Sequence, residues 1–413
     1  MKIALINYYS RMLEYPNRYT LPTMRLAEYL ISSGYNVDLV PIDLNKYDKF
    51  DYSKLANKYD LIGFSNYSWV EHAVLYGDKK IKELDKDVEI VIGGAQTEVL
   101  NINDYDKEYF ILGEGEKALK NLCEHIFNGT NDEEFFEKNR NIFDKEHTNR
   151  SKVEEHIEIH NPLFTNIDVP YEDRKFLWYE TCRGCAFKCG YCGHRTRENV
   201  EYIDLNIVKQ EIKNIGDKGF EEVFVIDPNF AGTKERAKKV ISYFNEYAKD
   251  TKIGLYFRPE FLDDEMIEKL SKANLTEIRI GIQTTNPNVP KWLRSNNLTS
   301  INNQLPKLSE NGINWRGELI VGLPGDNFKG LKESMEFVEN LKPSTYFCYP
   351  LTAIPNTPLY KIKDKTTENY WFKSDEKGKV IETNSCSKEE LIEMQEYANI
   401  KTNNYNKKLV RKI

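Results

Sequence analysis

The feature that most constrains this chain is a cluster of four cysteines within eleven residues: Cys182, Cys185, Cys189 and Cys192. The other three of the seven cysteines are scattered along the chain. A secreted disulfide framework spaces its cysteines out, whereas a tight cluster in a chain that is not exported is typical of a metal site. Soft thiolates of this kind select Zn²⁺ or an iron–sulfur cluster.

The last three of these cysteines follow a C-x3-C-x2-C spacing, in a loop after the strand predicted at 176–181. A four-iron cluster needs one ligand per iron, so three thiolates leave one iron open to a ligand from outside the protein. The alternative is a zinc site that uses Cys182 as its fourth ligand. The four cysteines lack the two separated knuckles that are usual for zinc, so we interpret Cys182 as a bystander.

Strand and helix signals alternate over residues 1–130, which predicts a parallel sheet with helices on both faces. Helices are expected at 21–34 and 72–84, and a strand, a glycine-rich turn and a helix within 109–127. Ligands of such sheets bind at the carboxyl ends of the strands. The small residues expected at those ends are Ser65, Gly93, Gly94, Gly113 and Gly115.

A second alternating series covers residues 175–360, with six strand–helix repeats. This pattern predicts an open, partial (β/α)6 barrel of the TIM type, with its active site in the loops at the carboxyl ends of the strands. Residues 131–174 are charged and weakly periodic, which indicates a linker with one short helix. Residues 361–413 are polar and contain one clear helical pattern. The fold class is therefore α/β, with two alternating domains and a short helical C-terminal segment.

The charge balance is 58 Lys and Arg against 65 Asp and Glu, a net charge of −7. This gives no electrostatic footprint for nucleic acid or for an anionic membrane surface. No apolar run approaches the length of a membrane span. The first residues, MKIALINYYSR, read as a buried strand and lack the features of a signal peptide, so we expect a cytoplasmic protein.

The cysteine loop resembles that of the radical S-adenosylmethionine (SAM) superfamily. In that superfamily the open iron of a [4Fe-4S] cluster chelates the amino and carboxylate groups of SAM, and the reduced cluster splits SAM to a 5′-deoxyadenosyl radical. The resemblance assigns Cys185, Cys189 and Cys192 to the cluster. It also matches Tyr191, directly before the last cysteine, to an aromatic position that packs near the adenine.

The resemblance extends over nearly all of residues 1–360. Residues 181–185, Thr-Cys-Arg-Gly-Cys, look like the "SRGC" entry of the cobalamin-binding radical SAM class. Residues 227–230, Asp-Pro-Asn-Phe, look like its "DDxNF" strand end, which faces the methionyl group of SAM. Residues 281–284 resemble "GxQS", and residues 355–359 resemble "PGTPL" with Asn in place of Gly.

Residues 317–326 resemble a merged "GxIxGxxE" and "GLPGE" pattern, whose backbone runs beside the adenine. Glycines there permit close approach of a ligand to the backbone. Arg258 ends the third strand as the arginine of that class does. The SAM contacts implied by the resemblance are Tyr191, Asp227, Asn229, Arg258, Gln283, Ile320 and Gly322.

Residues 1–130 resemble the cobalamin (B12)-binding domain of this class, a flavodoxin-type Rossmann-like fold with "GG" and "GEGE" turns. The small strand-end residues named above would contact cobalamin. The D-x-H-x-x-G motif that supplies a histidine to cobalt is absent, so we expect no histidine on cobalt. His72 and His125 are expected on helix surfaces. The alternative is a fold retained without cobalamin, since strand-end glycines bind many phosphorylated ligands.

The resemblance implies methyl transfer to an unactivated carbon of a small-molecule or peptide substrate, with electrons from a donor such as flavodoxin or ferredoxin. Two alternatives stay open. One is a radical SAM cyclase, epimerase or rearrangement enzyme, in which Cys348 could donate hydrogen, although core packing is the favoured interpretation of that residue. The other is a zinc-stabilised binding protein without catalysis. The pattern assigns neither catalytic residues nor a substrate.

Overall fold

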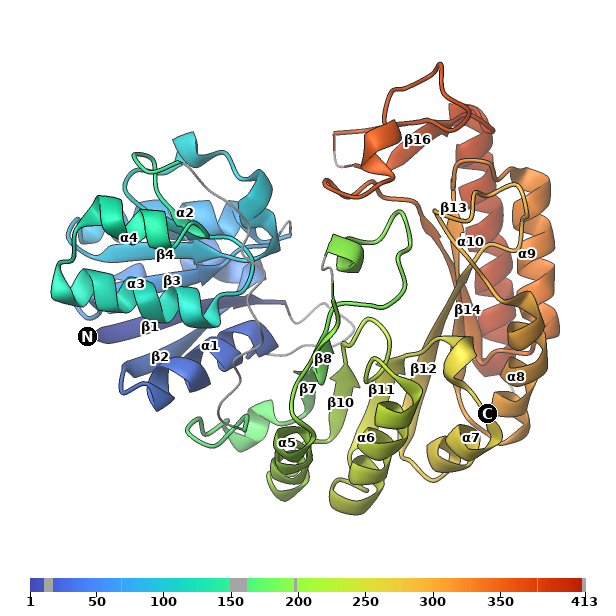
Figure 1. Cartoon of the computed structure of the whole chain (residues 1–413), viewed down its shortest axis with the longest axis horizontal. Helices are drawn as coiled ribbons and strands as arrows, with labels where there is room; N and C mark the ends of the chain where they lie inside the picture. The colour runs from blue at the N-terminus through green and yellow to red at the C-terminus, as the bar shows by residue number, and fades with distance from the viewer. Residues whose placement is uncertain (11–17, 68, 149–161, 197–198, 377, 411–413) are drawn as a thin grey trace. The chain divides into compact units, whose positions relative to one another are not determined.

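The structure is a computed structural model, and it describes residues 1–10, 18–67, 69–148, 162–196, 199–376 and 378–410 (Figure 1). The chain divides into two compact units. The first unit comprises Met1–Trp178 with Ile203–Glu221, and the second comprises Tyr179–Tyr202 with Glu222–Ile413. Each is described by itself below.

The first unit is built on a six-stranded sheet in the order β2-β1-β3-β4-β5-β6. Its first five strands are parallel, as predicted, and the sixth is antiparallel to β5. Residues 3–9 of β1 are all buried, as expected for the apolar run of a strand covered on both faces. The strands are β1 (Lys2–Tyr9), β2 (Asn36–Asp43), β3 (Leu61–Ser65), β4 (Glu89–Gly93), β5 (Tyr109–Ile111) and β6 (Ile142–Phe143).

Helices cover both faces of this sheet, and each face has its own apolar core. One core joins β1 and β3 to α2, and the other joins the opposite face to α1 and α3. α3 ends at Gly129, which adopts the left-handed conformation (φ +61°) typical of a helix C-terminus. The helices are α1 (Leu21–Ser32), α2 (Glu71–Leu84), α3 (Glu116–Asn128) and α4 (Asp132–Lys138). Both α4 and β6 lie in the region predicted as a linker, so its start belongs to this fold.

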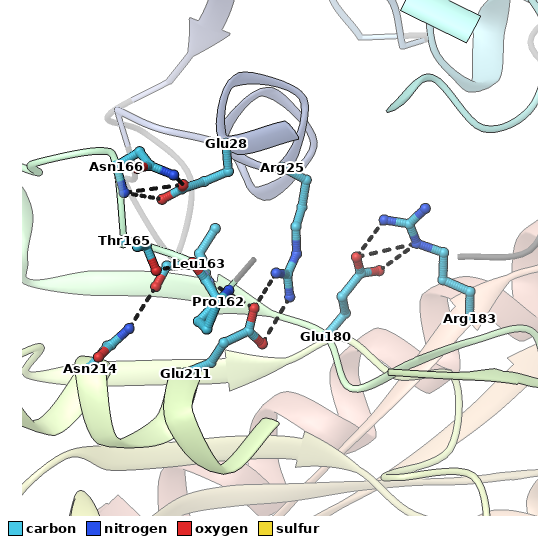
Figure 2. Close-up of polar contacts among 10 residues, drawn as sticks. All are labelled: Arg25, Glu28, Pro162, Leu163, Thr165, Asn166, Glu180, Arg183, Glu211 and Asn214. Carbon is cyan, nitrogen blue, oxygen red and sulfur yellow. Dashed lines mark hydrogen bonds and ion pairs between the residues drawn. The ribbon is translucent and has the colours of Figure 1, made fainter. Parts of the chain in front are cut away.

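A fifth helix, α5 (Leu205–Asp217), groups with the first unit although it follows the cysteine loop in the chain. The reason is a buried polar cluster (Figure 2). The Glu211 carboxylate, fully buried, accepts two hydrogen bonds from the guanidinium of Arg25 on α1 and one from the backbone N–H of Leu163 at 2.9 Å. A buried ion pair of this kind is costly to break because one unpaired charge would remain in the interior.

The sheet β14-β13-β12-β11-β10-β7 lies in the second unit from β14 to β10, and Tyr179, the last residue of β7, begins that unit. Its sequential strand order confirms the predicted open barrel. The pairings from β10 to β14 are all parallel. The strands are β7 (Phe176–Tyr179), β10 (Glu222–Val225), β11 (Lys252–Tyr256), β12 (Leu275–Gln283), β13 (Trp315–Val321) and β14 (Thr345–Pro350). The helices between them are α6 (Lys234–Tyr247), α7 (Asp264–Ser271), α8 (Leu298–Glu310) and α9 (Phe328–Asn340).

The two faces of this sheet differ in composition. Along β13, Trp315, Leu319 and Val321 are buried, and a Cβ on Gly317 would lie 2.9 Å from Val338 of α9. Because strand residues alternate between faces, Arg316, Glu318 and Ile320 lie on the face away from α9. This face is called the inner face below.

The C-terminal part contains more than the single helix that was predicted. Before helix α10 (Lys388–Val410), which packs on β14, a hairpin forms from β15 (Phe372–Ser374) and β16 (Val380–Thr383). Strands of three and four residues carry too little alternation to be recognised in the sequence. Among the described residues, no helix is long and apolar enough to cross a membrane.

Candidate functional site

The cysteine loop in the second unit is closed at its base by a short hairpin. β8 (Cys182–Arg183) pairs antiparallel with β9 (Glu201–Tyr202), so the two ends of the loop are held together. Directly before the hairpin, the Glu180 carboxylate pairs with the Arg183 guanidinium at 2.6 Å (Figure 2). The strand pairing and this ion pair therefore both fix the start of the loop.

Asp227 fastens the entry of this loop to the end of β10. Its carboxylate is fully buried and accepts four hydrogen bonds. Two come from Thr181, from its N–H and its hydroxyl, both at 2.6 Å; the others come from the N–H of Cys182 at 3.1 Å and of Ala231 at 2.8 Å. Burial raises the pKa of Asp227, and these donors oppose the shift by stabilising the ionised form.

The far side of the loop is held by a second segment. The N–H of Gly190 donates to the carbonyl of Leu293 at 3.0 Å, and the N–H of Leu359 donates to the carbonyl of Gly190 at 2.9 Å. A Cβ on Gly190 would lie 2.7 Å from the ring of Trp292, so only glycine fits at this position without a shift. The loop is thus clamped between the Trp292 segment and the residues that follow β14.

The four clustered thiols occupy two environments. Cys185, Cys189 and Cys192 are half-buried in the loop, and the Cys189 sulfur accepts a hydrogen bond from Arg294 Nη1 at 3.4 Å. Cys182 is 2% exposed, and burial with the nearby Asp227 raises the pKa of its thiol. Among the described residues, no group of three His, Cys, Asp or Glu side chains is placed to hold a metal ion. The assignment of these three thiols to a cluster therefore rests on their spacing and stays a prediction. The bystander role of Cys182 stays a prediction.

Two strand ends beside the loop carry buried donors without partners. Asn229 Oδ1 accepts from the N–H of Arg258 at 3.0 Å, while Asn229 Nδ2 and Arg258 Nη1 are buried and bond to no residue that the structure describes. The Arg258 guanidinium lies 4.1 Å from the ring centre of Phe187, which belongs to the cysteine loop. Two unpaired donors at this place suit an anionic ligand group such as a carboxylate.

Tyr191 and Gln283 lie near the same loop. Burial raises the pKa of Tyr191, and its charged neighbours include Arg258, Arg294 and Cys189. Gln283 ends β12 in the left-handed region, at φ +71°, which is unusual for a residue with a side chain. Ile320 is half-buried on β13, and Gly322 follows β13 with φ +92°. Their assignment as SAM contacts, and that of Asp227, stays a prediction.

Asn356, where the related pattern has Gly, adopts φ +64°. Asn tolerates this conformation better than most residues do, so the substitution preserves the turn.

A second group of residues lies at the carboxyl ends of the strands in the first unit. Asn66, fully buried after Ser65, has no hydrogen-bond partner for either side-chain atom among the described residues. Gly94, which follows Gly93, adopts φ +122°, and a Cβ there would overlap the carbonyl oxygen of Asn66. Gly113 adopts φ +78°, and a Cβ on Gly115 would lie 3.0 Å from Leu26.

The histidines of the first unit differ partly from expectation. His125 was expected on a helix surface but is 6% exposed, because its ring stacks on Phe135 of α4 at 3.9 Å. It lies in the last turn of α3, at the opposite end from the carboxyl ends of the strands. His72 is exposed as expected and lies in the first turn of α2, near those ends.

Two further histidines of the charged region, His156 and His160, lie outside the described residues.

Cys348, considered as a hydrogen donor at the end of β14, lies on the face of the sheet opposite to the inner face. It is 7% exposed and alternates with the inner-face residues Phe347 and Tyr349. The expectation that it faces the active region was therefore wrong, and the core-packing interpretation is favoured.

Comparison with known proteins shows which family this part of the chain resembles. The model of the radical SAM superfamily matches residues 179–338, which contain the cysteine loop and the strand ends around it. This part of the chain belongs to the radical SAM superfamily. The cofactors of that superfamily, a [4Fe-4S] cluster and SAM, agree with the C-x3-C-x2-C spacing of the cysteine loop.

Two curated relatives match at low identity. The ribosomal protein uS12 methylthiotransferase RimO of Clostridium kluyveri is 25% identical over 294 residues, covering 66% of this chain and 62% of that protein. The tRNA-2-methylthio-N(6)-dimethylallyladenosine synthase of Natranaerobius thermophilus is 21% identical, covering 52% of this chain and 51% of that protein. The chain thus spans less than two thirds of the length of either relative.

Solved structures match over more of the chain. The radical SAM methyltransferase TsrM from Kitasatospora setae, with tryptophan substrate and a SAM analogue bound, has a TM-score of 0.72 at 17% identity, covering 87% of this chain and 75% of that one. The same protein with cobalamin and a [4Fe-4S] cluster has a TM-score of 0.71 at 16% identity, covering 87% of this chain and 74% of that one. At this identity the likeness shows the fold alone: a Rossmann-like sheet followed by a radical SAM partial barrel.

The sequence pattern missed residues that support the site through tertiary contacts. Trp292, Arg294 and Asn296 belong to the segment between β12 and α8, and none lies in a recognisable motif. Arg294 Nη2 donates to the carbonyl of Gly281, and Asn296 Nδ2 donates to the carbonyl of Ile282 at 2.7 Å. A Trp and an Arg in a connecting loop give no signal from which these contacts could be predicted.

Proposed function

We propose that this radical SAM enzyme binds cobalamin in its first unit and transfers a methyl group to an unactivated carbon. The observation that carries the proposal is that one chain shares both its Rossmann-like sheet and its radical SAM barrel, over 87% of its length, with the fold of a cobalamin-binding methyltransferase. One sequence relative is named a methylthiotransferase, a transferase of a methyl-containing group, which is compatible with this class of reaction.

The residues around the cysteine loop fit SAM. Cys185, Cys189 and Cys192 would hold three irons of the cluster, leaving the fourth to the amino and carboxylate groups of SAM. The unpartnered donors of Asn229 and Arg258 would bind the methionyl carboxylate. When bound, the cluster and SAM would supply a 5′-deoxyadenosyl radical. The protein's own contribution is to position them and to exclude water.

The strand ends of the first unit fit cobalamin in two respects. The buried amide of Asn66 has both its donor and its acceptor available, as a polar ligand requires. Gly94 allows the backbone to come close where a Cβ would not fit. We also propose that no histidine binds cobalt, because His125 is buried at the opposite end of α3. Cobalamin would supply the methyl group, and flavodoxin or ferredoxin would supply electrons.

The test is anaerobic reconstitution of the full chain with iron, sulfide and cobalamin, followed by incubation with SAM that carries a deuterated methyl group. The proposal expects about four irons per chain, retained cobalamin and label on cobalt. Iron with SAM cleavage but without retained cobalamin would instead favour the cyclase, epimerase or rearrangement alternative. One zinc per chain without iron would favour the binding-protein alternative.

Electron paramagnetic resonance of the cob(II)alamin form tests the axial ligand. The proposal expects no nitrogen superhyperfine splitting, in wild type and in a His72→Ala variant alike. Splitting that disappears in His72→Ala would contradict the unligated assignment and identify His72, in the first turn of α2, as the ligand.

A further inference from the structure

The inner face of the sheet in the second unit carries four charged side chains in the middle of two strands. Glu277 and Arg279 lie on β12, and Arg316 and Glu318 lie on β13. The register pairs Arg279 with Arg316 and Gly281 with Glu318. Side chains at these alternate positions share one face, so the four charges form a compact group.

Three of these four side chains are fixed by one another. One oxygen of Glu277 accepts a hydrogen bond from Arg279 Nε at 2.8 Å, and the other forms an ion pair with Arg316 Nε at 2.8 Å. Each guanidinium also lies over an aromatic ring, Arg279 over Phe224 at 4.5 Å and Arg316 over Phe347 at 4.8 Å. The positions of both guanidinium groups are therefore fixed, and the Glu277 carboxylate pairs with both of them.

Glu318 differs from the other three. Among the residues that the structure describes, it has no hydrogen bond and no ion pair within 4 Å. Burial raises the pKa of its carboxyl, and the charges of Arg279 and Arg316 oppose this shift. A half-buried carboxylate in this position is stabilised when a ligand brings a hydrogen-bond donor to it.

Glu318 lies beside the predicted position of SAM. Its neighbour on β12 is Gly281, and the amide of Gln283 folds over the place where a Cβ of residue 281 would be. Its own strand continues to Ile320 on the same face. Gln283 and Ile320 are both predicted SAM contacts, so a group held by Glu318 would lie next to the radical.

An aromatic wall adjoins the charges on β14. Phe347 and Tyr349 lie across from Glu318 and Ile320, and their rings stack at 6.1 Å with an interplanar angle of 19°. Tyr349 is 43% exposed, so the wall has an open surface. Flat apolar ligand groups pack favourably on such a surface.

The charges of this face sum to zero, since Arg279 and Arg316 balance Glu277 and Glu318. A ligand with one positive and one negative group keeps this balance, because its ammonium pairs with Glu318 and its carboxylate offsets the arginine charge that Glu277 alone does not neutralise. A purely cationic or purely anionic ligand would leave one charge uncompensated in a half-buried place.

We propose that the inner face binds an aromatic α-amino acid as a zwitterion. Its ammonium bonds Glu318, its carboxylate faces Arg279 and Arg316, and its ring packs on Phe347 and Tyr349. The inference rests on the proposed function for the position of SAM, and it names the substrate class of that site.

The experiment uses the full chain with its cluster reconstituted, in calorimetric titrations. The probes are the three aromatic L-amino acids and, for each, the amine that lacks the carboxylate and the acid that lacks the amine. The variant is Glu318→Gln, which keeps the shape and removes the charge. The control is Glu333→Gln, an exposed carboxylate on α9. The unfolding midpoint and 5′-deoxyadenosine formation are measured on the same preparations.

At least one amino acid should bind, with its amine and its acid each about tenfold weaker or more. Glu318→Gln should lose about tenfold or more in affinity with an unchanged unfolding midpoint, while Glu333→Gln binds like wild type. Binding by none of the probes, or equal binding by Glu318→Gln, would overturn the inference. If SAM is cleaved but no amino acid binds, this inference alone fails; if the amino acid binds without SAM cleavage, the proposed function fails instead.

Discussion

Replacing Asp227 should show how much the cysteine loop depends on its hydrogen bonds to this carboxylate, because all the cysteines remain in the variant. In Asp227→Asn, the single carbonyl oxygen can still accept from Thr181 and Cys182, but the new NH₂ group faces the N–H of Ala231. That N–H is then buried without an acceptor, which costs about 1–3 kcal/mol. The remaining bonds also lose the assistance of the charge, so we expect a total loss of about 3 kcal/mol.

A loss of this size should lower the unfolding midpoint by about 6–12 °C for a unit of this length. The loop should also hold less iron after reconstitution, although all its cysteines are present. The assay compares iron content and thermal unfolding of wild type, Asp227→Asn and the control Asp250→Asn, an exposed residue. The role assigned to Asp227 would be refuted if Asp227→Asn holds as much iron as wild type and unfolds within about 2 °C of it, a negligible change.

Three further predictions concern the loop and the first unit. Cys185→Ala should abolish SAM cleavage while Cys182→Ala retains it; loss of the cluster in Cys182→Ala would show that this buried thiol is a ligand. Gly190→Ala should lower iron retention, because its methyl group would overlap the neighbouring indole, and normal retention would show that the clamp can give way. Burial and then the charge of Glu108 raise the pKa of Asp78 to about 8. A carboxyl with a raised pKa binds more protons in the folded state, so the free energy of unfolding should fall as pH rises from 5 to 9, by at most about 5 kcal/mol. Urea titrations of Asp78→Asn should show a weaker pH dependence, and an equal dependence in both proteins would contradict this.

The alternation of strands and helices predicted both sheets, because long apolar strands such as β12 and amphipathic helices such as α9 carry strong periodic signals. The sequence EVFVIDPNF favours a strand over all of residues 222–230, whereas β10 ends at Val225. The strand ends there because Asp227 turns inward to accept hydrogen bonds from the cysteine loop, a contact that no local pattern encodes. The alternation missed β6, whose two residues are too few to alternate.

The candidate site was predictable to the extent that it lies in contiguous motifs. The three cluster cysteines and the strand ends at Asn229 and Arg258 follow from spacing and resemblance. The burial of His125 does not, because it depends on Phe135 of α4, which comes from a region with weak periodicity. Likewise Arg294 reaches Cys189 only because the loop that carries it folds back over the cysteine loop.

The geometry of the strand ends suggests a division of roles within the Asp-Pro-Asn-Phe segment. Both oxygens of Asp227 are saturated by donors of the chain itself, so a ligand could bind this carboxylate only by displacing the bonds that hold the loop entry. Asn229 Nδ2 and Arg258 Nη1, in contrast, are buried donors with no partner among the described residues. Because leaving such donors unpaired is costly and pairing them with a carboxylate is favourable, SAM gains more from these two groups than from Asp227. It follows that Asp227→Asn should act mainly on iron retention, and Asn229→Ala mainly on the affinity for SAM.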